Sequence, residues 1–335
     1  MKVLITREIP QAGINILNIY GDRLELIYKK GAPITPARLK KAIKGVDAIL
    51  PVVPDKITKE IINAAGKKLK VISTYSVCHD HVDLEHATKK NIYVGNTPST
   101  TKEAEAVAEH VLALLLSVGR HIPQADKYCR DQKYKYFDPV RFVGPSFKNK
   151  TIGIIGFGRI GQHVAKLTKG GLNMQVLYND PKTHPEAETL LDAQKVDLDT
   201  LLEHSDIVSL HTPLTKYTKY LINEDDLRKM KPLAYLINTS RGPIVNEKAL
   251  TTALKGGWLA GAALDVFENE PKINSELLEL DNVVLSPHVA SATWEARIHM
   301  ARMAAENVID VLINKKPPRY LVNKELAQEE ISSLT

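Results

Sequence analysis

A glycine pattern in the middle of the chain constrains the fold most. The stretch TIGIIGFGRIGQ places Gly156, Gly158 and Gly161 directly after an apolar run typical of a β-strand. Where a strand turns sharply into a helix, the first glycine permits the turn, the second leaves room for a pyrophosphate, and the third lets the helix pack on the strand. The helix N-terminus presents unpaired N–H groups to that anion. We therefore expect a Rossmann-type dinucleotide site, with a helix from Arg159 onward.

An acidic residue follows the next apolar run. Asp180 lies 24 residues after Gly156 and directly before Pro181. A carboxylate at this place accepts hydrogen bonds from the adenosine ribose and repels a 2′-phosphate, so the sequence favours NAD over NADP. NADP stays open because Lys182 and His184 can accommodate a phosphate, and a turn residue before proline is the other interpretation of Asp180.

The first hundred residues alternate short β-rich runs with helical patterns. Helices are expected at 35–45 and 58–68, each with a threonine N-cap and a glycine near its end. This alternation predicts a parallel sheet with helices on both faces. The expected strands are 2–6, 23–28, 47–53, 70–74 and 91–95.

A second alternating set begins at the glycine pattern, and a chain of 335 residues is long enough for two domains. We expect an α/β protein of two doubly wound parallel sheets. The helix at 101–120 would join them, and the final helix, about 291–314, would return to the first. The expected strands are 151–156, 174–179, 206–211, 234–240, 261–267 and 282–287. Residues 1–99 with 290–335 would form the substrate domain, and 100–289 the inserted Rossmann domain.

Composition excludes several classes of protein. No apolar run approaches the ~18 residues of a membrane helix. The net charge is +6, but the basic residues are scattered, so we expect no nucleic-acid partner. Two cysteines, Cys78 and Cys129, cannot make a disulfide framework, which favours the cytoplasm. The stretch VCHDHVD (77–83) looks like a metal cluster, but neighbouring side chains of an extended loop point apart, so we expect no metal.

Three groups suited to hydride chemistry follow strands of the second set. Reduction of a carbonyl needs a cation to polarise it and a proton donor for its oxygen. Arg241 can bind a carboxylate and a neighbouring carbonyl, and His288 can exchange a proton near neutral pH. Glu270 can support the imidazolium, although Glu268 is an equal candidate from the residues alone. A turn arginine and a helix-capping histidine are the alternative interpretations.

Six ordered motifs resemble the D-isomer-specific 2-hydroxyacid dehydrogenases over about residues 1–323, and most closely the glyoxylate and hydroxypyruvate reductases. The motifs lie at 80–99, 104–120, 152–161, 236–250, 261–271 and 282–293. The resemblance implies a flavodoxin-like substrate domain, NAD or NADP as cofactor, a small 2-oxoacid or 2-hydroxyacid substrate and a homodimer through the nucleotide domains. D-lactate-type dehydrogenases and NAD-sensing regulators on the same scaffold are the alternatives.

The resemblance also implies roles for single residues. Arg241 would hold the substrate carboxylate and 2-oxygen. His288 would be the acid in reduction, paired with Glu270 rather than Glu268. The implied cofactor contacts are Gly156, Gly158, Arg159, Ile160, Gly161, Asp180, Pro181, Lys182, Thr239, Ser240, Asp265 and Ala290.

On the substrate side, the resemblance implies backbone N–H groups of Val77 and Cys78. The family usually has glycine at Cys78, so a positive φ there would strain the chain. The expected pocket walls are Val52, Val53, Pro54, Tyr75 and Trp294. If Trp294 reaches the pocket, small substrates such as glyoxylate or hydroxypyruvate are favoured.

Overall fold

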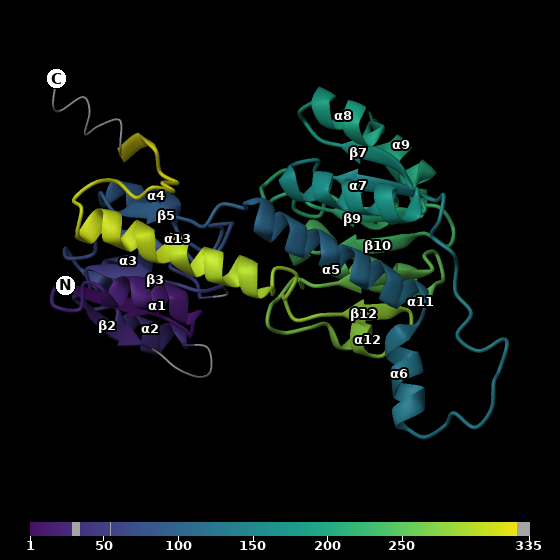
Figure 1. Cartoon of the computed structure of the whole chain (residues 1–335), viewed down its shortest axis with the longest axis horizontal. Helices are drawn as coiled ribbons and strands as arrows, with labels where there is room; N and C mark the ends of the chain where they lie inside the picture. The colour runs from purple at the N-terminus through teal and green to yellow at the C-terminus, as the bar shows by residue number, and fades with distance from the viewer. Residues whose placement is uncertain (29–33, 54, 327–335) are drawn as a thin grey trace. The chain divides into compact units, whose positions relative to one another are not determined.

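The chain forms two α/β units, each with one parallel sheet (Figure 1). The computed structural model describes residues 1–28, 34–53 and 55–326. Unit 1 comprises Met1–Lys102 and Thr293–Thr335, and unit 2 is the continuous stretch Glu103–Ala292. Pro54, expected in a pocket wall, lies outside the described residues.

Unit 1 has a five-stranded sheet in the order β2-β1-β3-β4-β5. This is the flavodoxin-like strand order, in which the order of the strands along the sheet reverses between β1 and β3. Every strand pair is parallel, as the alternating sequence predicted. The strands are β1 (Lys2–Ile5), β2 (Glu25–Tyr28), β3 (Ala48–Leu50), β4 (Val71–Ser73) and β5 (Tyr93–Gly95).

Helices cover both faces of this sheet. In β1, Val3 and Ile5 belong to one apolar cluster and Leu4 to another, because successive side chains point to opposite faces. The last helix, yellow in Figure 1, packs on the first: a Cβ at Gly13 would lie 2.6 Å from the carbonyl oxygen of Ala301. The helices are α1 (Gln11–Asn18), α2 (Pro36–Ala42), α3 (Lys59–Ala65), α4 (Leu84–Lys89) and α13 (Trp294–Leu312).

The two predicted threonine caps differ. Thr35 caps α2, since its hydroxyl accepts from the N–H of Arg38 at 3.3 Å. Thr58 is the N-cap residue of α3, as predicted, but its side chain makes no cap hydrogen bond. Its hydroxyl instead donates to the Glu60 carboxylate at 2.7 Å.

Unit 2 has a seven-stranded parallel sheet in the order β12-β11-β10-β9-β6-β7-β8. The order reverses between β6 and β9, which is the Rossmann arrangement. The sequence did not predict β8, a short edge strand with two exposed polar residues and no apolar alternation. The strands are β6 (Thr151–Ile155), β7 (Gln175–Asn179), β8 (Ala193–Lys195), β9 (Ile207–Leu210), β10 (Tyr235–Asn238), β11 (Gly261–Leu264) and β12 (Val283–Leu285).

Two apolar clusters lie on the two faces of this sheet. The long helix α5 contributes Val107, Val111 and Leu114 to one of them. The helices are α5 (Thr101–Gly119), α6 (Ile122–Arg130), α7 (Arg159–Leu172), α8 (Pro185–Leu191), α9 (Leu198–His204), α10 (Glu224–Lys229), the 3₁₀ turn η1 (Gly242–Ile244), α11 (Glu247–Lys255) and α12 (Ser275–Leu278). In the described part of the chain, no helix has the length and apolar character needed to cross a membrane.

Candidate active site

The glycine loop between β6 and α7 has the shape that the sequence predicted. Gly156 has a φ of +91°, and a Cβ there would lie 2.7 Å from the carbonyl of His211. A Cβ at Gly161 would overlap the carbonyl oxygen of Gly156. At Gly158, by contrast, a Cβ would meet nothing within 4 Å. The first and third glycines therefore serve packing, and the second leaves open space where a pyrophosphate fits.

Asp180 is fixed beside this loop. One carboxylate oxygen accepts from the N–H of Phe157 at 2.8 Å, and the other from the N–H of Lys182 at 2.8 Å. His184 Nε2 lies 3.6 Å from the second oxygen. The carboxylate thus stands at the end of β7, where a dinucleotide places its adenosine ribose. Pro181 and Lys182 follow on the surface.

The residues expected beside the nicotinamide lie at the carboxyl ends of β10, β11 and β12. Among the described residues, the buried hydroxyl of Thr239 has no hydrogen-bond partner. The hydroxyl of the next residue, Ser240, donates to the carbonyl of Thr212. Buried polar groups without a partner are uncommon, so the Thr239 hydroxyl fits a place where a polar ligand group binds. Together with the glycine loop, these residues fit a dinucleotide.

His288 and Glu270 form a close pair. Nδ1 of His288 lies 2.9 Å from Oε2 of Glu270, and Oε1 of Glu270 accepts from the N–H of Phe267 at 3.1 Å. The carboxylate therefore fixes the orientation of the ring.

Glu268, the rival candidate in the sequence, points elsewhere. Its carboxylate accepts from the hydroxyl of Tyr220, and its N–H donates to the carboxylate of Glu247 at 3.0 Å. The two acids are two residues apart in the chain, yet only Glu270 meets the imidazole of His288 in the described structure.

Arg241 lies on the loop that starts at the same edge of the sheet, after β10. Asn238, Leu264 and Leu285 are paired across β10, β11 and β12, so these parallel strands end at one level. A Cβ at Gly242 would overlap the backbone of Phe267, which holds the loop after β10 against the loop after β11. The structure thus places Arg241 on a loop that contacts the segment leading to Glu270.

A second histidine at this edge has different chemistry. Burial lowers the pKa of His211 to about 3, and its Nε2 lies 2.8 Å from the hydroxyl of Ser209. The ring is therefore neutral near pH 7 and is unsuited to donating a proton.

The expected substrate loop belongs to unit 1. Val77 and Cys78 are partly buried after β4, and the carbonyl of Val77 accepts from the side chain of Asn96 at 2.7 Å. Cys78 is not among the described residues with positive φ, so the condition under which strain was expected there is not met. Contact of this loop with a substrate stays a prediction.

The residues expected to line the substrate pocket differ in how exposed they are. Tyr75 is 6% exposed and belongs to the core of unit 1. Trp294 begins α13 and is 80% exposed, so it does not pack in a core. Val52 and Val53 are partly exposed. Within the described ranges, no group of three or more side chains could hold a metal ion, which includes the stretch 77–83.

Sequence reasoning missed two residues beside Asp265. The Ser286 hydroxyl donates to the Asp265 carboxylate at 2.6 Å, and His110 Nε2 lies 3.0 Å from that hydroxyl. Both stand in motifs that the sequence analysis had singled out. A polar residue in the apolar run of α5 was the available signal for His110.

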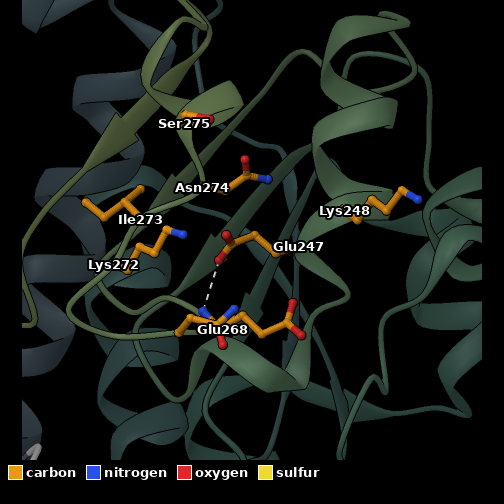
Figure 2. Close-up of a pocket in the computed structure, with 8 residues that line it drawn as sticks. Glu247, Lys248, Glu268, Lys272, Ile273, Asn274 and Ser275 are labelled. Carbon is orange, nitrogen blue, oxygen red and sulfur yellow. Dashed lines mark hydrogen bonds between the residues drawn. The ribbon is translucent and has the colours of Figure 1, made fainter.

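A polar pocket of about 590 Å³ lies beside the loop after β11 (Figure 2). Figure 2 shows Glu247 extending from α11 to the backbone N–H of Glu268. Glu247 is 8% exposed, and burial raises the pKa of its carboxyl group. The lining residues are Glu247, Lys248, Glu268, Asn269, Lys272, Ile273, Asn274 and Ser275. Since Arg241, Glu270 and His288 are not among them, this pocket is separate from the candidate active site.

The raised pKa of Glu247 predicts a dependence of stability on pH. Because the folded-state pKa lies above the unfolded value, the stability from this group is full below the unfolded pKa and is lost as pH rises through the folded pKa. Glu247→Gln keeps an oxygen for the Glu268 N–H and removes this loss. The free energy of unfolding, measured with denaturant at about pH 4 and about pH 7, should therefore change more favourably with rising pH in the variant than in wild type. The exposed-site control Glu186→Gln should behave like wild type, and a change in Glu247→Gln equal to that of wild type would contradict the assignment.

Comparison with known proteins shows the family of the chain. The family described as D-isomer specific 2-hydroxyacid dehydrogenase, NAD binding domain, matches residues 112–290. A glyoxylate reductase of Thermococcus litoralis is 47% identical over 329 residues, with 97% of each chain covered. A glyoxylate reductase of Thermofilum pendens is 49% identical over 328 residues, which cover 97% of this chain and 95% of that protein. The TT0316 protein of Thermus thermophilus has a crystal structure with a TM-score of 0.88 and 39% identity, covering 96% of this chain and 100% of that one. The chain therefore belongs to the D-isomer-specific 2-hydroxyacid dehydrogenase family.

Proposed function

We propose that this chain reduces a small 2-oxoacid, with glyoxylate or hydroxypyruvate favoured, to the D-2-hydroxyacid with NAD(P)H as hydride donor. The observation that carries the proposal is the 2.9 Å pair between His288 and Glu270, at the sheet edge where Arg241 also leaves its strand. The glycine loop of the same unit supplies the dinucleotide site. The names of the similar proteins from Thermococcus litoralis and Thermofilum pendens support the choice of glyoxylate.

In this mechanism the glycine loop and Asp180 would hold NAD(P)H, which would supply the hydride for C2 of the oxoacid. The guanidinium of Arg241 binds the substrate carboxylate and polarises the neighbouring carbonyl. Nε2 of His288 gives its proton to the carbonyl oxygen, and Glu270 stabilises the imidazolium before that transfer. The balance is one oxoacid, one NAD(P)H and one proton converted to one hydroxyacid and one NAD(P)⁺. In the reverse direction the neutral His288 takes the proton back.

The role of the pair is tested by three substitutions. His288→Ala should lower kcat by about 10²–10⁴-fold, because it removes the proton donor, whereas NADH binding followed by fluorescence should be kept. Glu270→Gln should also lower kcat, because the imidazolium loses its charged partner. Glu268→Gln is the matched control, since it removes a nearby carboxylate that does not contact the ring. The assay follows NADH absorbance with glyoxylate, hydroxypyruvate and pyruvate. Full turnover in His288→Ala, or equal losses in both glutamate variants, would remove the pair from this role.

We also propose that NAD is preferred over NADP. The Asp180 carboxylate is held by the N–H groups of Phe157 and Lys182, so it cannot easily turn away from a 2′-phosphate. Specificity of this kind depends on repulsion of the wrong ligand.

Asp180→Ala should shift the ratio of kcat/KM for NADPH to that for NADH by about tenfold towards NADPH, which corresponds to about 1.4 kcal/mol. The control Asp199→Ala removes an exposed aspartate of α9 and should leave the ratio unchanged. A wild-type enzyme that prefers NADPH, or an Asp180→Ala ratio equal to that of wild type, would refute this preference.

We propose further that two copies of the chain associate through α6 and the segment 131–146. This stretch, residues 122–146, is called the arm. In Figure 1 the arm stands away from the seven-stranded sheet. Several of its apolar side chains are exposed, including Phe137 by 81% and Val140 by 79%. Large exposed apolar groups gathered on one segment are typical of an interface. The others are Ile122, Tyr134, Tyr136 and Val143. Since the resemblance implies a homodimer through the nucleotide unit, a second copy is the proposed occupant.

Sedimentation equilibrium should find a dimer for wild type and a monomer for the double variant Phe137→Asp, Val140→Asp, because charges at these positions disfavour burial. Leu190→Asp places the same charge at an equally exposed site on α8 and should stay dimeric. A monomeric wild type, or a dimeric double variant, would contradict the proposal. The cytoplasmic location expected from the sequence stays a prediction.

A further inference from the structure

The carboxylate of Asp265 is a buried hub directly after β11. The side chain is fully buried. Oδ1 accepts from the hydroxyl of Ser286 at 2.6 Å and from the N–H of Val289 at 2.9 Å, while Oδ2 accepts from the N–H of Ala290 at 2.8 Å. A buried carboxylate is stable only with such donors.

These bonds hold the backbone around His288. The N–H of His288 donates to the carbonyl of Asp265 at 2.8 Å. His288 has a φ of +55°, a left-handed conformation that residues other than glycine adopt infrequently. Both following N–H groups, of Val289 and Ala290, are bound to the Asp265 carboxylate. The position of the imidazole therefore depends on where Asp265 places its two oxygens.

His110 reaches this hub from a different element. It lies on α5, which the burial of Val107 and Val111 fixes on the sheet. Nε2 of His110 lies 3.0 Å from the hydroxyl oxygen of Ser286 and 3.5 Å from Oδ1 of Asp265. Because a serine hydroxyl has one hydrogen, and Ser286 gives it to Asp265, Ser286 must accept from Nε2–H of His110.

The hub is charged. Burial alone would raise the pKa of Asp265, but hydrogen bonds from His110, Ser286, Val289 and Ala290 hold that pKa below its ordinary value. The side chain therefore stays an anion that needs every one of these donors. Removing one of them leaves its carboxylate less well oriented.

We propose that His110 is a positioning residue for the reaction: it donates to Ser286, which donates to Asp265, which holds the left-handed backbone of His288 in place for proton transfer. The inference rests on the proposed role of His288 as the acid. His110 itself takes no part in the proton transfer. The relay joins α5 to the loops after β11 and β12, all within unit 2.

The proposal predicts a loss in kcat with little change in substrate KM. Misplacement of the acid weakens an interaction made in the transition state, whereas substrate binding through Arg241 is left intact. In the full chain, His110→Leu should lower kcat about tenfold and change the KM for glyoxylate by less than about twofold. His110→Gln should recover kcat to within about threefold of wild type, because its amide N–H can donate to Ser286.

Two further variants isolate the relay. Ser286→Ala should lower kcat to a similar extent, and the double variant with His110→Leu should be little worse than either single one, because residues in one chain of hydrogen bonds are not additive. His204→Leu is the matched control, since it removes an exposed helical histidine of α9. It should leave kcat unchanged.

A second readout does not depend on activity. Hydrogen–deuterium exchange at residues 286–292 should be faster in His110→Leu than in wild type and close to wild type in His110→Gln, since the loop loses its hydrogen-bonded support only in the first variant.

Equal exchange and equal kcat in the two His110 variants would overturn the proposal, as would fully multiplicative losses in the double variant. If His288→Ala keeps full turnover, the proposed function fails. If His288→Ala is inactive while His110→Leu is unaffected in both readouts, only this inference fails.

Discussion

The in-register parallel pairing of β10, β11 and β12 is the constraint on which the site depends. Parallel strands leave their carboxyl ends at one edge of the sheet, and here Asn238, Leu264 and Leu285 are level. Loops from three neighbouring strands must therefore start side by side. A guanidinium, a carboxylate and an imidazole that are distant in sequence thus come from adjacent loops, without any special path of the chain.

Close backbone approaches turn this arrangement into a precise one. Gly242 has no room for a side chain against Phe267, so the loop after β10 lies directly on the loop after β11. Gly156 likewise approaches His211, which brings the glycine loop against the loop after β9. In each case the glycine has no Cβ, so the two backbones can touch directly. Such close contact leaves little freedom for the residues that follow each glycine in its loop.

The acidic residues near the site differ in their hydrogen-bond partners. Glu270 meets an imidazole, Glu268 meets a tyrosine hydroxyl, and Asp265 meets backbone N–H groups and a serine. Burial pushes Glu247 towards its neutral form, while donors keep Asp265 charged despite burial. One region thus combines a carboxylate that pairs with an imidazole and others that bind backbone N–H groups of the loops, because each lies in a different local environment.

The alternation of strands and helices, the glycine turn and the polar residues at strand ends were readable from the sequence, since each follows from local spacing. The residues alone did not separate Glu270 from Glu268, which only the family resemblance did, and they left open whether Cys78 has a positive φ, which it does not have. Sequence reasoning also missed the link from His110 to Asp265. These features depend on loop paths and on contacts between distant segments. Only the tertiary structure decides them, because local periodicity fixes which element a residue joins but not which side chain it meets.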